Sequence, residues 1–432
     1  MIKRHIAWVF FFALSISTAQ VSDTWFIHAG SVLSVPGERV QSQQTIVVRD
    51  GLIERIEDGY ILPDSVDSNA KIIDLKDQFV LPGLMDMHVH LLGQLSKTSR
   101  TDSLFITTSM DALTGAHYAK KTLMAGFTTV RDLGGNPEAI YALRDAVAKG
   151  LVPGPRIYAA GSALAATGGH GDVDGVKPEL LKLWTPETIC DGPYECRKAV
   201  RNAIKMGADW IKITATGGVL SDTATGTDQQ MADDELIEIV HTAHGLGVKV
   251  AAHAHGTNGI KAALKAGVDS IDHGTFCDDE AISLFKKTGA YMVPTLSPGV
   301  KVPATMEGNP FFTDAIKAKA LAASAASQKT FLKAYESGVK IAFGTDSSVT
   351  PHGENADEFV MMVKAGMSPS DAIRSATLIS AELLGLDKKL GTLEVGKLAD
   401  LISVSGSPLD DISVLRSVNF VMKDGEIIKV AK

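Results

Sequence analysis

The sequence predicts an α/β protein, in which a (β/α)8 barrel carries a small discontinuous β-sandwich domain built from both termini. Two observations carry this prediction. Through the middle of the 432-residue chain, short apolar runs alternate with helical stretches, as parallel strands alternate with helical crossovers. At both ends the pattern changes to short strand-like runs with hairpin turns, at Asp50-Gly51 and Asp424-Gly425.

The chain begins with the pattern of a secretory signal peptide, which we assign to residues 1–19. Lys3 and Arg4 precede an apolar run from Ile6 to Ile16, and the small residues 17–19 then offer a cleavage site. The run is too short to cross ~30 Å of hydrocarbon, and no later apolar stretch approaches the length of about 20 residues that a span needs. We therefore expect a secreted or periplasmic protein with no membrane span after removal of the signal.

Short strands follow the signal and return at the end of the chain. The expected strands are Trp25–Ala29, Thr45–Arg49 and Leu52–Glu57, then Leu398–Ser403, Val418–Lys423 and Glu426–Val430. Neither group has enough strands to bury a face alone, so we expect them to pair. Residues 20–80 and 390–432 would form the composite β-sandwich domain, and residues 81–389 the barrel.

The central region contains the barrel pattern itself. We count eight apolar runs: Leu84–Met87, Thr128–Arg131, Arg156–Ala160, Trp210–Ile213, Lys249–Ala252, Ser270–Asp272, Tyr291–Pro294 and Lys340–Thr345. Expected helices between them include Met110–Ala125, Arg197–Met206, Glu235–Leu246, Asn258–Ala266 and Asp279–Thr288. A doubly wound open sheet is the alternative, but no G-x-G-x-x-G motif follows an early strand, which disfavours a dinucleotide site.

Composition excludes several classes of protein. The chain is 45% hydrophobic and 21% charged, as in ordinary globular proteins and unlike disordered ones. Lys and Arg number 42 against 50 Asp and Glu, with no basic run, so a nucleic-acid partner is not expected. Three cysteines do not make a disulfide framework; Cys190 and Cys196 are either a local disulfide or two thiols.

Polar side chains gather at the carboxyl ends of the expected strands, where a barrel places its active site. His88 and His90 end the first run and point to the same side, because strand side chains alternate. The other groups at strand ends are Lys212, His253, His255, His273 and Asp346. A lone histidine in such a position is usually a satisfied core residue, but imidazoles and a carboxylate converging from several strands predict a metal site.

Several of these segments resemble the metal-binding motifs of the amidohydrolase superfamily. They are PGLMDMHVH at 82–90, HAHG at 253–256, SIDHG at 270–274 and FGTD at 343–346. The segments TGGH at 167–170, KITATGG at 212–218 and PHG at 351–353 resemble the imidazolonepropionase-like branch, which includes prolidase-like Xaa-Pro and Xaa-Arg/Lys dipeptidases and ochratoxin-hydrolysing amidases. The similarity runs from about residue 46 to residue 429.

The resemblance implies two divalent metal ions, with zinc expected. His88, His90 and Asp346 would bind the buried ion, and His253 and His273 the outer one. Lys212 would react with carbon dioxide and bridge both ions as a carbamate, which requires the neutral amine favoured by an apolar strand. The alternative for Lys212 is an ordinary ion-paired lysine at a strand end.

The remaining histidines are candidates for contact with the substrate. His253 and His255 face the same side of their strand, so side-chain geometry does not separate them; the resemblance makes His253 the ligand and leaves His255 to polarise the scissile carbonyl. His170 and His352 would contact substrate from loops, with solvated loop residues as the alternative. Asp346 would also be catalytic, taking a proton from the nucleophile and passing it to the leaving amine.

The resemblance thus predicts an exported binuclear-metal amidohydrolase. A hydroxide that bridges the metals would attack the amide bond of a dipeptide or N-acyl amino acid and release the C-terminal residue. A cationic leaving residue ranks first, bulky apolar residues second and proline third, with Asp222, Asp172 and Glu354 as acidic candidates to hold a cation. The alternatives are an amidase on aromatic amides such as ochratoxin, a hydrolase of cyclic imide or imidazolone rings, and an inactive binding protein. We also expect a homo-oligomer.

Overall fold

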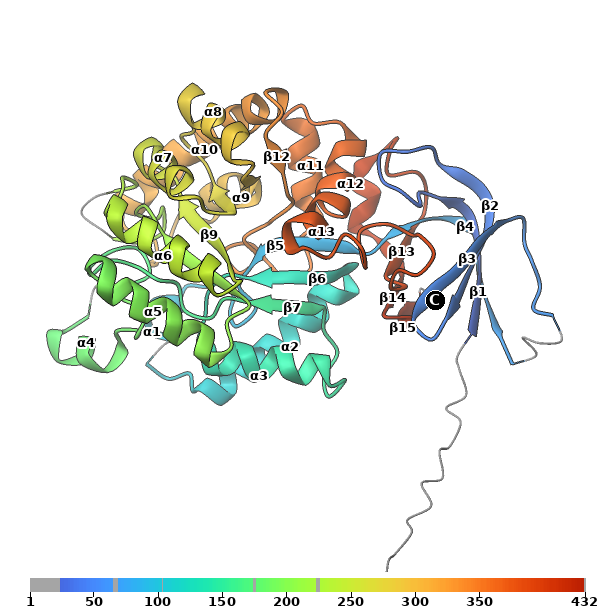
Figure 1. Cartoon of the computed structure of the whole chain (residues 1–432), viewed down its shortest axis with the longest axis horizontal. Helices are drawn as coiled ribbons and strands as arrows, with labels where there is room; N and C mark the ends of the chain where they lie inside the picture. Colours follow the sequence, from blue (N-terminus) through green and yellow to red (C-terminus); the bar gives the residue numbers. More distant parts are fainter. Residues whose placement is uncertain (1–23, 65–68, 103, 174–175, 223–225, 431–432) are drawn as a thin grey trace, which may run out of the picture.

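The computed structural model describes residues 24–64, 69–102, 104–173, 176–222 and 226–430. Figure 1 shows two parts: a sheet that contains the last strand of the chain, and a larger α/β body beside it. The expected signal peptide at 1–19 lies outside the described residues. No helix within the described ranges is long and apolar enough to cross a membrane.

Both ends of the chain contribute to one seven-stranded sheet. Its strands are β1 (Thr24–Val32), β2 (Gln41–Arg49), β3 (Leu52–Asp58), β4 (Lys71–Pro82), β13 (Leu401–Val404), β14 (Val418–Lys423) and β15 (Glu426–Val430), in the order β15-β14-β13-β4-β1-β2-β3. The expected pairing of the two ends is therefore present, through β4 and β13. The described strands form a single sheet, and a sandwich of two sheets is not confirmed.

Strand β4 was not expected from the sequence, and its burial explains why. Its first eight residues, from Lys71 to Gln78, are mostly exposed and include charged side chains, so no apolar alternation marks this part of the strand. Its last four residues, Phe79 to Pro82, are buried on both faces. Phe79 and Leu81 join the core of the α/β body, whereas Val80 joins the core on the opposite face of the sheet.

All eight central runs form parallel strands. They are β5 (Leu84–Val89), β6 (Phe127–Asp132), β7 (Arg156–Ala159), β8 (Trp210–Thr214), β9 (Lys249–Ala254), β10 (Ser270–His273), β11 (Tyr291–Val293) and β12 (Lys340–Ile341). They lie in a three-stranded sheet, β5-β6-β7, and a five-stranded sheet, β12-β11-β10-β9-β8. Isolated parallel bridges connect the two, Leu164 with Ile213 and Val89 with Ser347, but the sheets do not form one closed barrel.

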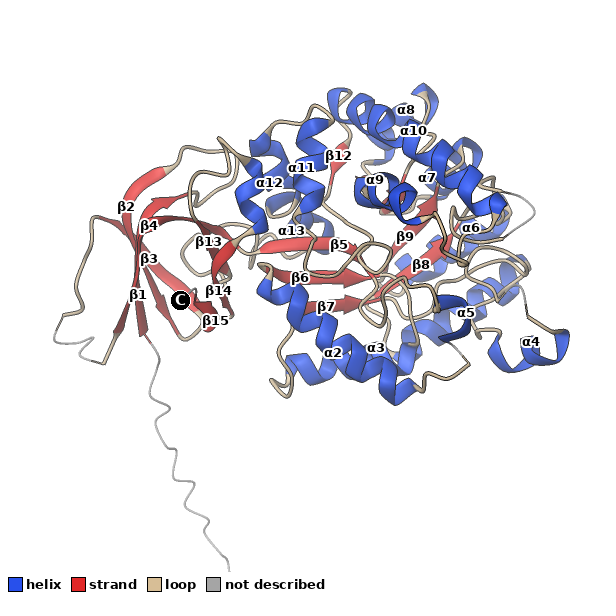
Figure 2. Cartoon of the chain, turned by 180° about the vertical axis from the view of Figure 1, so that it is seen from behind, coloured by secondary structure: helices blue, strands red, loops and turns tan. Residues whose placement is uncertain are grey.

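Helices cover the outside of these strands (Figure 2). They are α1 (Ser99–Asp102), α2 (Thr108–Met124), α3 (Pro137–Ala148), α4 (Pro178–Trp184), α5 (Gly192–Met206), α6 (Asp233–Gly245), α7 (Thr257–Ala266), α8 (Asp279–Thr288), α9 (Leu296–Thr305), α10 (Asp314–Glu336), α11 (Asp357–Lys364), α12 (Pro369–Ser375), α13 (Leu378–Leu384) and the 3-10 turn η1 (Ile412–Arg416). The five expected helices correspond to α2, α5, α6, α7 and α8.

The cysteine alternatives are resolved as a disulfide. Cys190 and Cys196 are bonded, with 5.0 Å between their Cα atoms, and join the loop before α5 to that helix. Cys277 is a buried free thiol.

An ion cluster ties the seven-stranded sheet to the body. Arg156, at the start of β7, donates to Asp400 (3.1 Å), to Asp424 and to the hydroxyl of Thr129 (2.8 Å). Asp400 also accepts from the backbone N–H of Asp424 at 2.9 Å, which fixes the β14–β15 turn. Burial lowers the pKa of Arg156, but the two carboxylates outweigh it and raise the pKa above its ordinary value, so the guanidinium stays charged.

Replacement of Arg156 should therefore destabilise the fold. Arg156→Met leaves Asp400, which is 4% exposed, without its cation, and we expect a loss of about 2–4 kcal/mol in the free energy of unfolding. Urea denaturation followed by circular dichroism measures it. Lys265→Met is the control, because it breaks only an exposed ion pair with Glu280 and should leave the midpoint nearly unchanged. Equal midpoints for both variants would contradict the assignment.

Candidate metal centre

The predicted site residues meet in one cavity at the carboxyl ends of the parallel strands. Its volume is about 430 Å³. The polar groups that line it include His88 (β5), Lys212 (β8), His253 (β9), His273 (β10), and His90, His170, His255 and Asp346 from the loops that follow strands. Strand ends that lie far apart in the chain thus supply one site, as parallel topology requires.

Three of these groups form a first cluster, His88, His90 and Asp346, whose ligand atoms lie within 4.8 Å of one another. The Asp346 carboxylate is 3.5 Å from Nε2 of His88 and 3.4 Å from Nε2 of His90. The other nitrogen of His90, Nδ1, lies 2.9 Å from the carbonyl oxygen of Gly134. That contact turns Nε2 toward the cluster, as an outer hydrogen bond does for a metal-binding imidazole.

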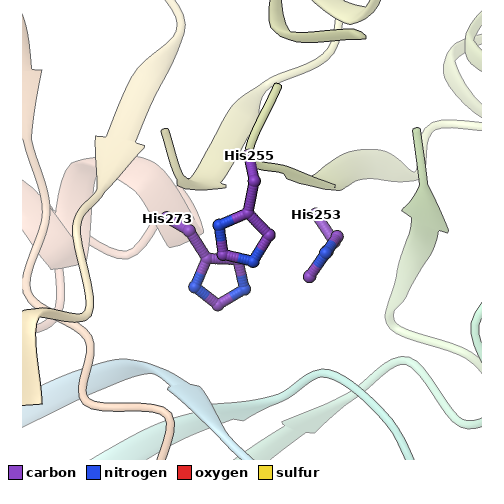
Figure 3. Close-up of side chains that lie close together, drawn as sticks. All are labelled: His253, His255 and His273. Carbon is purple, nitrogen blue, oxygen red and sulfur yellow. The ribbon is translucent and has the colours of Figure 1, made fainter. Parts of the chain in front are cut away.

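The second cluster contains His253, His255 and His273, again within 4.8 Å (Figure 3). The rings of His255 and His273 are stacked, with centroids 4.6 Å apart, and His253 stands edge-on beside them. Nδ1 of His255 lies 2.7 Å from the hydroxyl of Thr275, and Nδ1 of His273 lies 2.6 Å from that of Thr295. Both threonines therefore leave Nε2 of their histidine for another partner.

The geometry and chemistry of these groups fit metal ions. Nε2 of His253 is buried and has no hydrogen-bond partner among the described residues, which is costly unless a ligand occupies it. The two clusters are adjacent, since the rings of His88 and His273 are 5.0 Å apart. Imidazole nitrogen and carboxylate oxygen are the donors that zinc and similar divalent ions prefer.

The electrostatics keep the second cluster and Asp346 in their metal-binding forms. His90 differs, because burial lowers its pKa but Asp346 outweighs this and raises the pKa above its ordinary value. Burial, and then the neighbouring imidazoles, lower the pKa of His253 and His273 well below its ordinary value, and burial lowers the pKa of His255 to about 3. These rings are neutral at physiological pH, as a metal ligand must be. Burial alone would raise the pKa of Asp346, but His88 and His90 outweigh it and lower that pKa, so the carboxylate is ionised.

Lys212 lies beside the clusters on a buried carboxylate. Its Nζ pairs with Asp272, which also accepts from Arg131 at 3.1 Å, and all three side chains are nearly or completely buried. Burial lowers the pKa of Lys212, although Asp272 opposes this shift. In this arrangement Lys212 is the ion-paired lysine that the sequence left as the alternative to a carbamate.

The histidines predicted to contact substrate differ in whether they line the cavity. His170 lines the cavity, with its ring 4.3 Å from that of His253. His352 is not among the residues that line the cavity: its Nε2 lies 2.9 Å from the carbonyl oxygen of Gly93 and its ring stacks on Tyr118. Its side chain is buried, so it is not a solvated loop residue, and its contact with substrate stays a prediction. His255 is placed as closely for metal binding as His253, so its separation from the ligands remains a prediction.

Sequence reasoning missed the residues that orient the site. Thr275, Thr295, Asp272 and Arg131 are among them, and Asp86 is another. The Asp86 carboxylate accepts from the backbone N–H groups of His88 and Thr345, both at 3.1 Å, and so joins β5 to the turn that carries Asp346. Asp86 and Asp272 lie inside the motifs already described, two residues and one residue before a histidine, which was the available signal.

Comparison with known proteins gives consistent results. Residues 79–432 match the model of the amidohydrolase family. Ochratoxinase from Aspergillus niger is 32% identical, over 96% of this chain and 89% of that protein. Imidazolonepropionase from Mesorhizobium japonicum is 25% identical, over 85% of this chain and 87% of its own.

A comparison with solved structures gives relatives of the same kind. The crystal structure of a Xaa-Pro dipeptidase with methionine bound in its active site superposes with a TM-score of 0.88 and 44% identity, covering 94% of this chain and 99% of that one. The family match covers most of the chain and both clusters. The chain therefore belongs to the amidohydrolase family, as a hydrolase that acts on carbon–nitrogen bonds.

Proposed function

We propose that the protein is an exported, binuclear-metal amidohydrolase that cleaves the amide bond of dipeptides or N-acyl amino acids and releases the C-terminal residue. The observation that carries this proposal is the convergence of two three-residue donor clusters in one cavity. The dipeptidase and ochratoxinase relatives support amide bonds as the substrate.

Two zinc ions or similar ions would be held by His88, His90 and Asp346 and by His253 and His273, and Lys212, once converted to a carbamate, would supply a further ligand. When bound, they supply Lewis-acid polarisation of the carbonyl and activation of the attacking water. The conversion of Lys212 into a carbamate needs its neutral amine, which burial favours.

The protein's own groups then move the proton and stabilise charge. The ionised Asp346 would accept a proton from the attacking water and deliver it to the leaving nitrogen. His255, fixed at Nδ1 by Thr275, would direct Nε2 at the carbonyl oxygen as negative charge develops there. His170 lines the cavity next to His253 and would contact the substrate.

The cavity supports an uncharged, apolar leaving residue, in place of the cationic one ranked first from the sequence. Asp346 is the only carboxylate among the described residues that line the cavity, and it belongs to the first metal cluster, so it is not available to pair with a cationic substrate. The apolar residues that line it include Leu133, Val219, Leu220, Pro298, Val302, Ala320, Ala323 and Val349.

The three acidic loop residues considered for a cation all have other partners. Asp222 pairs with Arg100 at 2.7 Å and accepts from Thr313. Asp172 accepts from the backbone of Gly168 and Val173, and Glu354 pairs with Lys301 at 2.6 Å. None of them lines the cavity, so each is satisfied away from the substrate.

Cleavage of an aromatic amide such as ochratoxin is the second candidate, favoured by the similarity to ochratoxinase and by the same apolar wall. Export is supported by the signal pattern at 1–19 and by the Cys190–Cys196 disulfide, since such bonds persist in oxidising compartments.

Metal content is a direct test of the proposed centre. Protein prepared with zinc and bicarbonate should hold about two divalent ions per chain, because the donor set exceeds what one tetrahedral ion needs. Elemental analysis by mass spectrometry measures the ratio. A ratio that stays at zero would refute the metal centre.

Lys212→Ala should lower turnover more than about 100-fold and reduce the metal content, because the bridging group is lost. Acetate or propionate should restore part of the rate by replacing the carbamate. Lys340→Ala is the matched control, because Lys340 is exposed at the start of β12, whereas the metal ligands lie at the carboxyl ends of the strands. Wild-type rate and metal content in Lys212→Ala would leave Lys212 only its ion pair with Asp272.

A substrate screen tests the function directly. Dipeptides and N-acetyl amino acids that end in apolar residues should be hydrolysed with kcat/KM at least about tenfold above those that end in Lys or Arg, because an unpaired cation is costly in an apolar cavity. Amino-acid analysis identifies the product. Turnover of a cyclic imide, with none on any linear amide, would overturn the proposal.

A further inference from the structure

One buried carboxylate outside the metal clusters holds a wall of the cavity. Glu358, on α11, is 0% exposed. Its side chain accepts from the backbone N–H groups of Leu296 and Ser297, both at 2.7 Å, and from the Ser297 hydroxyl at 2.6 Å. Leu296 and Ser297 are the first two residues of α9. A side chain from another helix, α11, therefore accepts the hydrogen bonds of the first N–H groups of α9.

Helix α9 needs this external partner. Its first N–H groups lack partners within the helix, and the side chain of the N-cap residue, Thr295, makes no capping bond. A carboxyl group at this position satisfies two N–H groups. Burial raises the pKa of Glu358 to about 7, and in its ionised form the group also interacts favourably with the positive end of the helix. Helix α9 also contains Pro303, which weakens its own hydrogen bonding.

The start of α9 faces the substrate cavity. Pro298, Gly299 and Val302 line it, as does Thr295. Thr295 has a left-handed backbone, with φ 46° and ψ 60°, which is strained for a β-branched residue and persists only where its surroundings enforce it. From that backbone its hydroxyl reaches Nδ1 of His273 at 2.6 Å.

We propose that Glu358 is a positioning residue: through the first turn of α9 it fixes both the apolar wall that receives the leaving residue and the orientation of His273. The first part of this inference rests on the proposed function. The second part concerns only the protein and its metal site.

The test compares Glu358→Gln with Glu354→Gln. The glutamine at 358 presents an N–H group where Ser297 needs an acceptor, whereas Glu354 is an exposed residue four positions earlier that pairs with Lys301. With N-acetyl amino acids graded from glycine to phenylalanine, Glu358→Gln should raise KM about tenfold for the bulky members and much less for glycine. A merely structural role would instead lower apparent kcat equally for all substrates and leave KM unchanged.

Two measurements do not depend on activity. Hydrogen exchange in the peptide that covers residues 295–305 should speed up in Glu358→Gln and not in Glu354→Gln. Zinc should also be withdrawn by a chelator at least several-fold faster from Glu358→Gln, because His273 is less well oriented. If Glu358→Gln equals Glu354→Gln in exchange, zinc release and KM, the inference is wrong.

A milder variant protects the test against misfolding. Ser297→Ala removes only the hydroxyl contact and should shift the same quantities in the same direction by a smaller factor; if it shifts none of them while Glu358→Gln does not fold, the inference also fails. A wild-type protein that hydrolyses no amide would refute the proposed function, and hydrogen exchange and zinc release would still decide the role of Glu358.

Discussion

A buried carboxylate, Asp272, organises the interior of the α/β body. It lies on β10, is 0% exposed, and forms ion pairs with Lys212 of β8 and Arg131 of β6. These ion pairs connect three strands. Arg131 also donates to the carbonyl oxygen of Met87 at 2.7 Å, which adds β5. Removal of such ions from water costs several kcal/mol each, and their attraction returns this only with good geometry and further hydrogen bonds. The apolar core that surrounds these strands supplies the stability against which this cost is set.

Hydrogen bonds from neighbouring residues orient the histidines of the two metal clusters. Three histidines of the two clusters contact a backbone carbonyl or a threonine hydroxyl through Nδ1: Gly134 for His90, Thr275 for His255 and Thr295 for His273. Asp86 connects the backbone of His88 to that of Thr345. Gly134, Thr275 and Thr295 each lie two residues after the end of a strand, β6, β10 and β11, so the donor atoms are held close together before any ligand binds, and little reorganisation is then required.

Much of this arrangement follows from the sequence, because parallel strands end on one side and strand side chains alternate. That reasoning predicted one site for His88, His253, His273 and Asp346, which do share a cavity, and it identified all eight parallel strands of the α/β body. It missed β4, which pairs with β1 in parallel. It failed where a residue depends on a partner far along the chain. Glu358 serves backbone groups about 60 residues earlier, and the partners of Asp222 lie on other elements, so neither role leaves a local pattern. The contact between His352 and the carbonyl oxygen of Gly93 is likewise one that no local pattern marks.

The position of β4 between β1 and β13 has a consequence for biosynthesis. Residues Phe79 to Pro82 pair with β13, and β13 lies beyond the whole α/β body in the chain. At roughly 5–20 residues per second, a ribosome needs roughly 15–60 s to deliver that partner. Before β13 is available, the apolar residues 79–82 of β4 form an unpaired strand edge, and such edges can pair with other chains and lead to aggregation. Among the strand ladders of the described sheets, β4–β13 joins the residues that lie farthest apart in the chain, so this edge stays open until the C-terminal strands are available.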